Sequence, residues 1–280
     1  MNTQLEKIRE VQKEAWNKSS SGWKKWDDLM MNFLQPMSSE MIQMLNLNDT
    51  DIVLDVATGT GEPGLTIASL LKSGKVVGTD LAEEMLVVAE EKANNRRIKN
   101  FKTVCCDVSS LPFENDTFNA ISCRLGIMFF PDIQLALMEM IRVLKPGGRI
   151  VISVWDMKEK NFWINASMET MISGLGLNPP SGAPGLFRCS NDGFMAEHMR
   201  HAGLRNIQER KIEGKMTCGT IETYWSFITE LASPMAYGKA DEDLKQKIKE
   251  EILVKVNQKC ENGNIEMESC SIIVCGEKGN

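Results

Sequence analysis

The chain has 280 residues, a net charge of −6 and a pI near 5.2. Its 42% hydrophobic and 25% charged residues are ordinary for a soluble globular protein. The acidic balance argues against a nucleic-acid backbone as the main partner. No apolar run approaches the roughly 20 residues that span a bilayer, so we expect no stable membrane insertion. Residues 1–14 are polar and carry no secretory signal, so we expect a cytoplasmic protein.

The eight cysteines form no Cys-x-x-Cys pair and are scattered along the chain. We interpret them as small buried hydrophobic side chains rather than metal ligands or redox groups. Both histidines fall on one predicted helix over residues 191–202, where a packed or hydrogen-bonded role is the simplest interpretation. We therefore expect no metal.

Residues 1–48 precede the first strand and are predicted to form a helical cover, separate from a second domain over 49–280. In this segment Trp23, Trp26, Met30 and Phe33 follow helical spacing. The simplest interpretation is that this face packs on the domain, and the alternative is that it covers a substrate.

From residue 51 onward, short apolar strands alternate with amphipathic helices. We expect strands at 51–55, 76–80, 101–107, 118–123 and 149–155, and helices from Pro63 to about 72 and at 83–94 and 132–144. The helix at 132–144 is followed by Lys145-Pro-Gly-Gly, a typical helix end. Such alternation with short connections predicts a parallel sheet with helices on both faces.

The C-terminal half breaks this alternation. We expect helices at 163–173 and 191–202, a strand at 206–213, helices between 219 and 260, and a last strand at 268–276. Insertions at about 156–189 and 215–265 would then lie beside one sheet. We expect them to form a helical lid over the carboxyl ends of the strands, where open α/β sheets bind ligands.

The segment from Asp51 to Gly64 is the most informative of the chain. A buried strand is followed by the turn Gly59-Thr-Gly-Glu-Pro-Gly64, and a helix begins near Pro63. Glycines let a backbone approach a ligand closely, and a helix N-terminus offers unpaired N–H groups. Asp80 ends the next strand about 20 residues on, as in dinucleotide sites. The pattern alone fits either NAD or S-adenosylmethionine.

Four motifs in order favour the second cofactor. They are Leu54-Asp-Val-Ala-Thr-Gly-Thr-Gly61, Val77-Gly-Thr-Asp80, Cys106-Asp-Val-x-x-Leu-Pro-Phe113 and Arg142-Val-Leu-Lys-Pro-Gly-Gly-Arg149. With them the chain resembles class I S-adenosylmethionine-dependent methyltransferases, particularly the ubiquinone/menaquinone-biosynthesis branch. The resemblance covers residues 50–155. It implies a Rossmann-like seven-stranded sheet, mostly parallel with an antiparallel last strand.

The resemblance also implies a set of cofactor-binding residues. Asp55 would lie near the cofactor's amino group, directly or through water, and Asp80 would accept both ribose hydroxyls. Arg124 would contact the cofactor's carboxylate or a substrate anion. The remaining expected residues are Ala57, Thr58, Gly59 and Gly61 in the turn, Leu81 and Met85 beside the adenine, and Asp107 and Val108 at its edge. Ala57 stands where many members have glycine, and we expect the loop to keep its path.

A small-molecule acceptor is the leading hypothesis, with an oxygen, nitrogen or carbon nucleophile. Methyl transfer from a sulfonium is an in-line displacement that needs mainly alignment and exclusion of water. No residue pattern identifies a general base, so we name no catalytic residue. For the acceptor pocket we expect aromatic walls made by Trp16, Trp23, Phe129, Phe130, Trp155 and Trp163. The alternatives are an NAD-dependent oxidoreductase and a protein that binds S-adenosylmethionine without transferring its methyl group. The oligomeric state is open.

Overall fold

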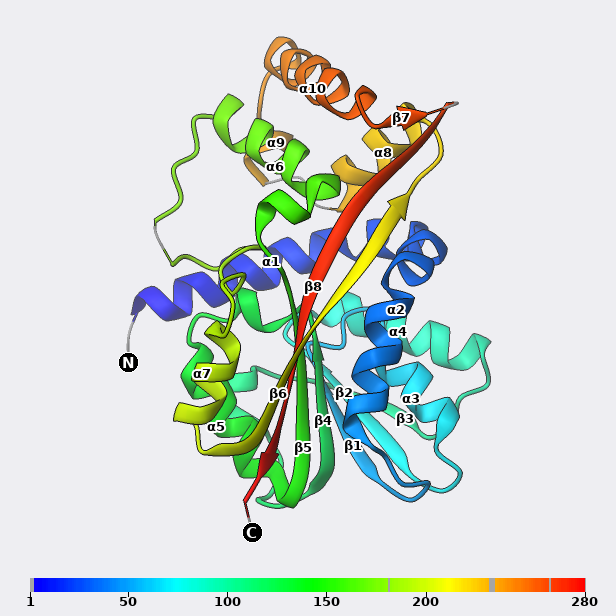
Figure 1. Cartoon of the computed structure of the whole chain (residues 1–280), viewed down its shortest axis with the longest axis vertical. Helices are drawn as coiled ribbons and strands as arrows, with labels where there is room; N and C mark the ends of the chain where they lie inside the picture. The colour runs from blue at the N-terminus through cyan, green and yellow to red at the C-terminus, as the bar shows by residue number, and fades with distance from the viewer. Residues whose placement is uncertain (1–2, 181, 232–234, 262, 280) are drawn as a thin grey trace.

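The computed structural model describes residues 3–180, 182–231, 235–261 and 263–279. Within these ranges one mixed sheet organises the chain, in the order β3-β2-β1-β4-β5-β8-β6 (Figure 1). Its strands are β1 (Ile52–Val56), β2 (Lys75–Asp80), β3 (Phe101–Cys105), β4 (Phe118–Arg124), β5 (Leu144–Trp155), β6 (Leu204–Thr217) and β8 (Asn264–Lys278), and the short β7 (Cys260–Glu261) pairs with β8. The last strand, β8, is antiparallel to both β5 and β6. The predicted fold class is confirmed.

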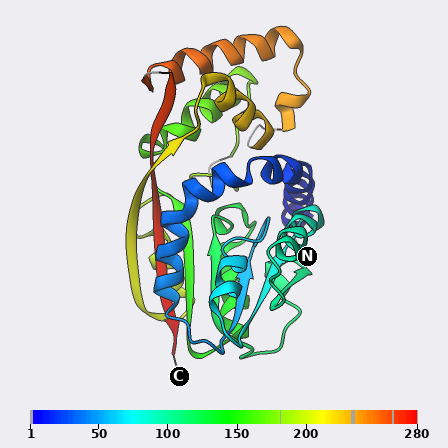
Figure 2. The same ribbon diagram turned by 90° about the vertical axis from the view of Figure 1, so that its right-hand side faces the viewer.

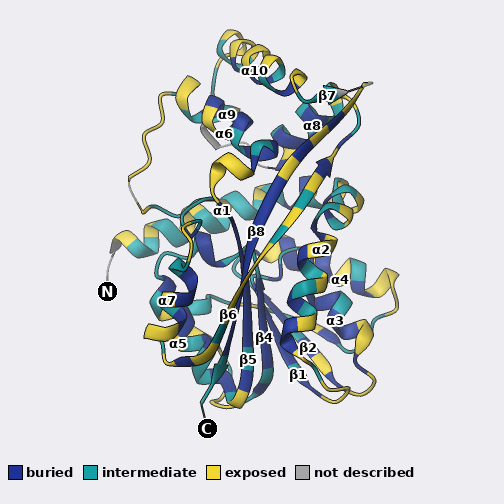
Figure 3. Cartoon of the chain, in the orientation of Figure 1, coloured by how far each residue is buried: buried dark blue, intermediate teal, exposed yellow. Residues whose placement is uncertain are grey.

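The central strands are apolar because helices cover both of their faces. Val53 and Leu54 of β1 are fully buried, as are Val151 and Ile152 of β5. A parallel strand buried on both faces carries a continuous apolar run rather than an alternating one. In Figure 3 the inner strands are dark blue along most of their length.

The helices of the sheet domain are α3 (Gly64–Leu70), α4 (Glu83–Asn95), α5 (Ile133–Val143) and α7 (Phe194–His201). Three short 3₁₀ turns are η1 (Val108–Ser110), η2 (Ile127–Phe129) and η3 (Lys158–Lys160). The helices α6 (Phe162–Gly174), α8 (Ile221–Leu231), α9 (Met235–Gly238) and α10 (Glu242–Asn257) lie in the two segments predicted as insertions, and we call them the insertion helices. They gather beyond one end of the sheet (Figure 1).

Two helices precede the sheet. The first, α1 (Thr3–Lys25), runs between the sheet domain and the insertion helices, as both views show (Figures 1 and 2). It packs against α4 on one side and α8 on the other. The second, α2 (Asp27–Leu45), packs on β4, β5, β6 and β8 through a buried methionine-rich face. No described helix is long and apolar enough to cross a membrane.

Some element boundaries differ from the predicted ones. The strand β5 begins at Leu144 rather than 149, so the Pro-Gly-Gly segment is part of the strand. Both β6 and β8 are longer than predicted, because they continue as a paired ribbon to Thr217 and Glu266 and so carry the second insertion. The interpretation of the cysteines as buried side chains is wrong for three of the eight: Cys105 at the end of β3 is exposed, and Cys106 and Cys260 are half-buried.

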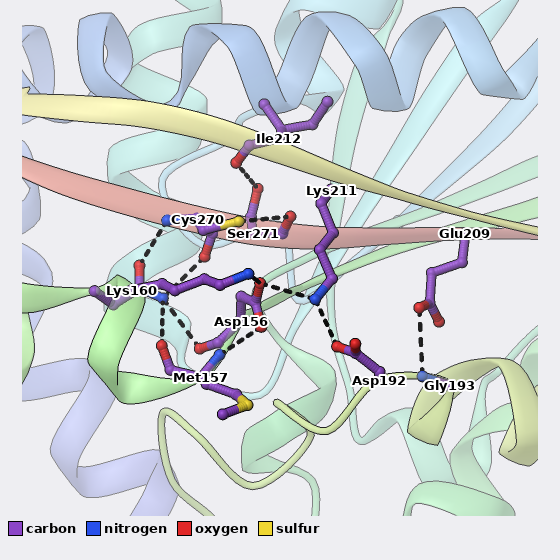
Figure 4. Close-up of polar contacts among 11 residues, drawn as sticks. Asp156, Met157, Lys160, Asp192, Gly193, Glu209, Lys211, Ile212, Cys270 and Ser271 are labelled. Atoms are coloured by element: carbon purple, nitrogen blue, oxygen red, sulfur yellow. Dashed lines mark hydrogen bonds and ion pairs between the residues drawn. The ribbon is translucent and has the colours of Figure 1, made fainter.

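A buried charge joins the first insertion to the sheet (Figure 4). The Asp156 carboxylate, fully buried just after β5, lies 3.1 Å from Lys160 Nζ and 3.2 Å from Lys211 Nζ. The backbone N–H of Met157 also donates to it, at 2.7 Å. The hydrogen bonds and two lysines outweigh the effect of burial and lower the pKa of Asp156 to about 2.

We expect Asp156→Asn to lower the free energy of unfolding by about 2 kcal/mol at neutral pH, because one pKa unit corresponds to about 1.4 kcal/mol. The folded-state pKa lies below the unfolded value of 3.8. The contribution is therefore complete above that value and disappears as the pH falls toward 2. Urea unfolding of both proteins at several pH values checks this. A wild-type advantage that grew on acidification would contradict it.

Candidate active site

A cavity of about 330 Å³ opens at the carboxyl ends of the parallel strands, beneath α1. Its walls come from the turn after β1, the ends of β2 and β4, the loop after β3, and the helices α1, α2, α6 and α8. The same cavity thus contacts the polar strand ends and the apolar helices of both insertions.

One end of the cavity, which we call the polar end, is lined by the carboxyl ends of the strands and by the turn after β1. Gly59 has a positive φ of 54°, and a Cβ at this position would point into open space. Gly61 also has a positive φ, of 101°, and a Cβ there would lie 2.6 Å from Leu65 Cδ1. Glycine is therefore required at 61 for packing, while at 59 it leaves backbone accessible to a ligand.

Asp55 lies under this turn rather than in the cavity. Its buried carboxylate accepts hydrogen bonds from Thr58 Oγ1 and Ser122 Oγ, both at 2.6 Å, and from the Gly64 N–H at 3.0 Å. Burial raises the pKa of Asp55 to about 6, although these hydrogen bonds act in the opposite direction. Because three donors already engage it, Asp55 fixes the path of the turn.

Asp80 faces the cavity from the end of β2. One oxygen accepts the Gly59 N–H and the other the Ala82 N–H, each at 2.9 Å. Burial raises the pKa of Asp80, and these backbone donors oppose the shift. A carboxylate has roughly four acceptor positions, so about two remain for a ligand diol.

Asp107, after β3, lines the same cavity but is held by the N-terminal helix. Arg9 Nε of α1 lies 2.5 Å from Asp107 Oδ2, and Arg9 Nη2 donates to Ser109 Oγ at 3.0 Å. The other Asp107 oxygen accepts the Ser109 N–H at 2.8 Å. This ion pair fixes α1 over the site.

Arg124, at the end of β4, brings a positive charge to the cavity. Its guanidinium donates to Ser38 Oγ at 3.0 Å and forms no ion pair within the described ranges. Burial lowers the pKa of Arg124, while Glu62, Asp55 and Asp27 raise it through their charges. A half-buried guanidinium that donates to a neutral hydroxyl and, within the described ranges, pairs with no carboxylate is a suitable site for a carboxylate ligand.

The other end of the cavity is an aromatic chamber. Trp155 and Trp163 lie with ring centroids 5.3 Å apart, and Phe227 of α8 lies 6.3 Å from Trp163. Nearer α1, the Trp16 ring contacts Phe129 edge-on at 5.0 Å. The chamber is completed by Trp23, Phe130, Met30, Leu34, Ile164, Met168, Leu186, Ile228 and Leu231.

Most residues expected from the sequence line this one cavity. They are Ala57, Thr58, Gly59, Asp80, Leu81, Met85, Asp107, Val108 and Arg124, together with the aromatic residues Trp16, Trp23, Phe129, Phe130, Trp155 and Trp163. Asp55 and Gly61 do not line it. Sequence analysis missed Arg9, Glu62 and Phe227. Helical spacing from Arg9 through Gln12, Trp16 and Ser19 to Trp23 was the one available signal for a cavity-facing side of α1.

Ala57 fits in the turn because Gly126, which lies beside it, has no side chain. Its φ is 52°, in the left-handed region, and a Cβ built on Gly126 would lie 2.5 Å from Ala57 Cβ. We expect Gly126→Ala to destabilise the protein by about 1–3 kcal/mol through overpacking. The double variant Ala57→Gly/Gly126→Ala should regain most of this loss, because the second methyl is gone. Urea unfolding measures the stability of both variants. Equal stability of wild type and Gly126→Ala would contradict the prediction, because it would show that the turn moves to accommodate the added methyl group.

Strand order, glycine turn and acidic strand ends together define the class: a Rossmann-like methyltransferase. The chain belongs to the ubiE/COQ5 methyltransferase family, whose model matches residues 11–168. The resemblance drawn from the sequence motifs is thereby confirmed.

The sequence relatives cover a limited part of the chain. It is 33% identical over 113 residues to a demethylmenaquinone methyltransferase of a Geobacillus species, covering 40% of this chain and 48% of that protein. The corresponding protein of Thermus thermophilus is 39% identical over 100 residues, covering 36% of this chain and 45% of that one. The chain therefore spans about half the length of the curated relatives it matches.

Solved structures share the fold. The Bacillus subtilis YcgJ protein superimposes with a TM-score of 0.61 at 21% identity, covering 87% of this chain and 98% of that one. A Haemonchus contortus phosphoethanolamine N-methyltransferase, solved with S-adenosylhomocysteine, gives 0.55 at 17% identity, covering 87% and 52% respectively. At these identities the likeness concerns the fold alone.

Proposed function

We propose that the protein transfers a methyl group from S-adenosylmethionine to a small, apolar, ring-bearing acceptor. One observation carries this proposal: a single cavity joins the polar strand ends to an aromatic chamber. A cofactor and an acceptor bound in it would share one space from which the surrounding helices exclude water.

The residues of the polar end fit this cofactor. Asp80 retains acceptor positions for a vicinal diol, and Gly59 leaves backbone open to the ligand. Asp107 and Val108 line the side where an adenine edge would need an acceptor and a donor. Arg124 offers a positive charge to a carboxylate. When bound, S-adenosylmethionine supplies a methyl group attached to a sulfonium sulfur. After the transfer this sulfur is a neutral thioether, which makes it a good leaving group.

The chain itself contributes position more than acid–base chemistry. The acids that line the cavity are Glu62, Asp80 and Asp107, and each already accepts hydrogen bonds or an ion pair. Among the described residues, no histidine lines it. The aromatic chamber would hold the acceptor ring against the polar end, and alignment of this kind is a large catalytic effect.

The acceptor class rests on the chamber and on the relatives. A flat ring suits walls of tryptophan and phenylalanine, which favour edge-on and offset contacts. The curated relatives are named demethylmenaquinone methyltransferases. Both observations support a quinone-type or phenolic ring, in its reduced form, as acceptor. A cytoplasmic location and the absence of a nucleic-acid substrate stay predictions.

The test is a product scan with methyl-deuterated S-adenosylmethionine over a panel of phenols, naphthols and reduced quinones. We expect a deuteromethylated product by mass spectrometry, formed with an equal amount of S-adenosylhomocysteine. Tight binding of S-adenosylhomocysteine without any product would favour the binding-only alternative. Tight NADH binding with no response to S-adenosylhomocysteine would favour the oxidoreductase, which family membership already disfavours.

A further inference from the structure

Glu62 is a carboxylate at the polar end of the cavity for which the proposed function has no role. It follows the second glycine of the turn, is 7% exposed and lines the cavity. Carboxylates are rarely buried to this extent unless they are paired. The donors that Glu62 has within the protein can be compared with the number of hydrogen bonds that a carboxylate accepts.

Three donors engage Glu62, all from α3 or from the chain just after α4. Its Oε2 accepts the Thr66 N–H at 3.1 Å and Thr66 Oγ1 at 2.7 Å, and its Oε1 accepts from Arg96 Nη1. Of roughly four acceptor positions on a carboxylate, one remains, on Oε1. These donors and the charge of Arg124 outweigh burial and lower the pKa of Glu62, so it is ionised at neutral pH.

Arg124, which carries the opposite charge, lines the same cavity. Arg124 and Glu62 interact through their charges but form no ion pair with each other within the described ranges. A half-buried cation and a buried anion that line one cavity without pairing present both signs of charge to a ligand. An α-amino acid group carries the two complementary charges on adjacent substituents of one carbon.

We propose that Glu62 binds the α-ammonium group of the cofactor's methionine end, while Arg124 binds its α-carboxylate. This assignment rests on the proposed function, because it names a further residue that holds the same cofactor. It makes Glu62 a cofactor-binding residue in addition to its contacts with Thr66 and Arg96.

The experiment compares two ligands by isothermal titration calorimetry. S-adenosylhomocysteine carries the amino acid group, and 5′-methylthioadenosine carries only the adenosine and the thioether. For Glu62→Gln, which keeps the shape of the side chain, we expect at least about tenfold weaker binding of S-adenosylhomocysteine, as for the loss of a charged hydrogen bond. The affinity for 5′-methylthioadenosine should stay within about twofold. Decarboxylated S-adenosylmethionine, which keeps the ammonium group, should lose affinity as S-adenosylhomocysteine does.

Arg96→Gln is the matched control, because it removes a partner of Glu62 and leaves the carboxylate in place. We expect it to keep the wild-type ratio of the affinities for S-adenosylhomocysteine and 5′-methylthioadenosine. If Glu62→Gln is unfolded at the assay temperature, Glu62→Asp replaces it, and the shorter carboxylate should give the same selective loss.

The possible results separate the two proposals. Unchanged binding of S-adenosylhomocysteine by Glu62→Gln overturns the assignment, and so does an equal loss for both ligands, which would limit Glu62 to supporting the turn. Wild-type protein that binds neither ligand overturns the proposed function, and the assignment with it.

Discussion

Replacing Asp80 with alanine is expected to weaken the binding of S-adenosylhomocysteine by about 1.5–3 kcal/mol, the scale for losing a hydrogen bond to a charged group. This is about a 10- to 150-fold rise in Kd. The carboxylate lies at the end of β2 with acceptor positions left after the Gly59 and Ala82 N–H groups are satisfied. The expected loss comes from ribose hydroxyls that would no longer donate to this carboxylate.

Two comparisons make this result specific. Asp49→Ala removes an exposed carboxylate paired with Lys72, away from the cavity, and should leave the affinity unchanged. Asp80→Asn keeps the shape and one acceptor, so its loss should be smaller than that of alanine. Calorimetry and thermal unfolding measured together separate lost binding from a collapsed turn. Wild-type affinity in a folded Asp80→Ala protein would remove Asp80 from the site.

The polar end of the site was predictable because it is encoded locally. A strand, a glycine turn and a helix start within 14 residues place Gly59 and Asp80 at neighbouring strand ends once the sheet is parallel. Asp55 shows the limit of this reasoning. The motif places Asp55 near the end of the first strand, but its carboxylate faces the turn, where one of its three donors is Ser122, a residue 67 positions away on β4.

The contacts that α1 and α8 make with the site could not be predicted in the same way. Arg9 meets Asp107 across 98 positions of sequence, and nothing near either residue indicates the pair. Phe227 reaches the cavity from the second insertion, which the family motifs do not cover. The Phe227 contact depends on how the ribbon of β6 and β8 carries α8 over the strand ends. The sequence predicts that the insertion is helical, but not which of its faces turns inward.

The position of α1 also explains how one cavity can be closed by polar contacts. Besides Arg9, Lys13 pairs with Glu83 at 3.4 Å, and Asn17 Oδ1 accepts the Glu84 N–H at 3.0 Å. Exposed ion pairs of this kind are weak and are screened by salt. The contacts of Lys13 and Asn17 with α4 therefore add little to the stability of this arrangement beyond the Arg9–Asp107 pair.

The second large effect concerns the aromatic chamber. We expect Trp163→Ala to lower the free energy of unfolding by about 3–5 kcal/mol, the range for truncating a buried aromatic side chain. Trp163 is 5% exposed, and its ring lies 5.0 Å from Phe33 and 5.3 Å from Trp155. Urea unfolding gives the value. Trp225→Ala is the control, because that ring contacts Tyr237 and Lys249 outside the cavity and should cost less.

The same variant tests how the cavity is divided. If the cofactor occupies the polar end and the acceptor the aromatic chamber, Trp163→Ala protein that is still folded should bind S-adenosylhomocysteine within about threefold of wild type, since a threefold change is below 1 kcal/mol. Its turnover of the acceptor found in the product scan should fall, because the wall that aligns the ring is gone. A loss of S-adenosylhomocysteine binding larger than that of Asp80→Ala would place the adenosine among the tryptophans and reverse the assignment of the two ends.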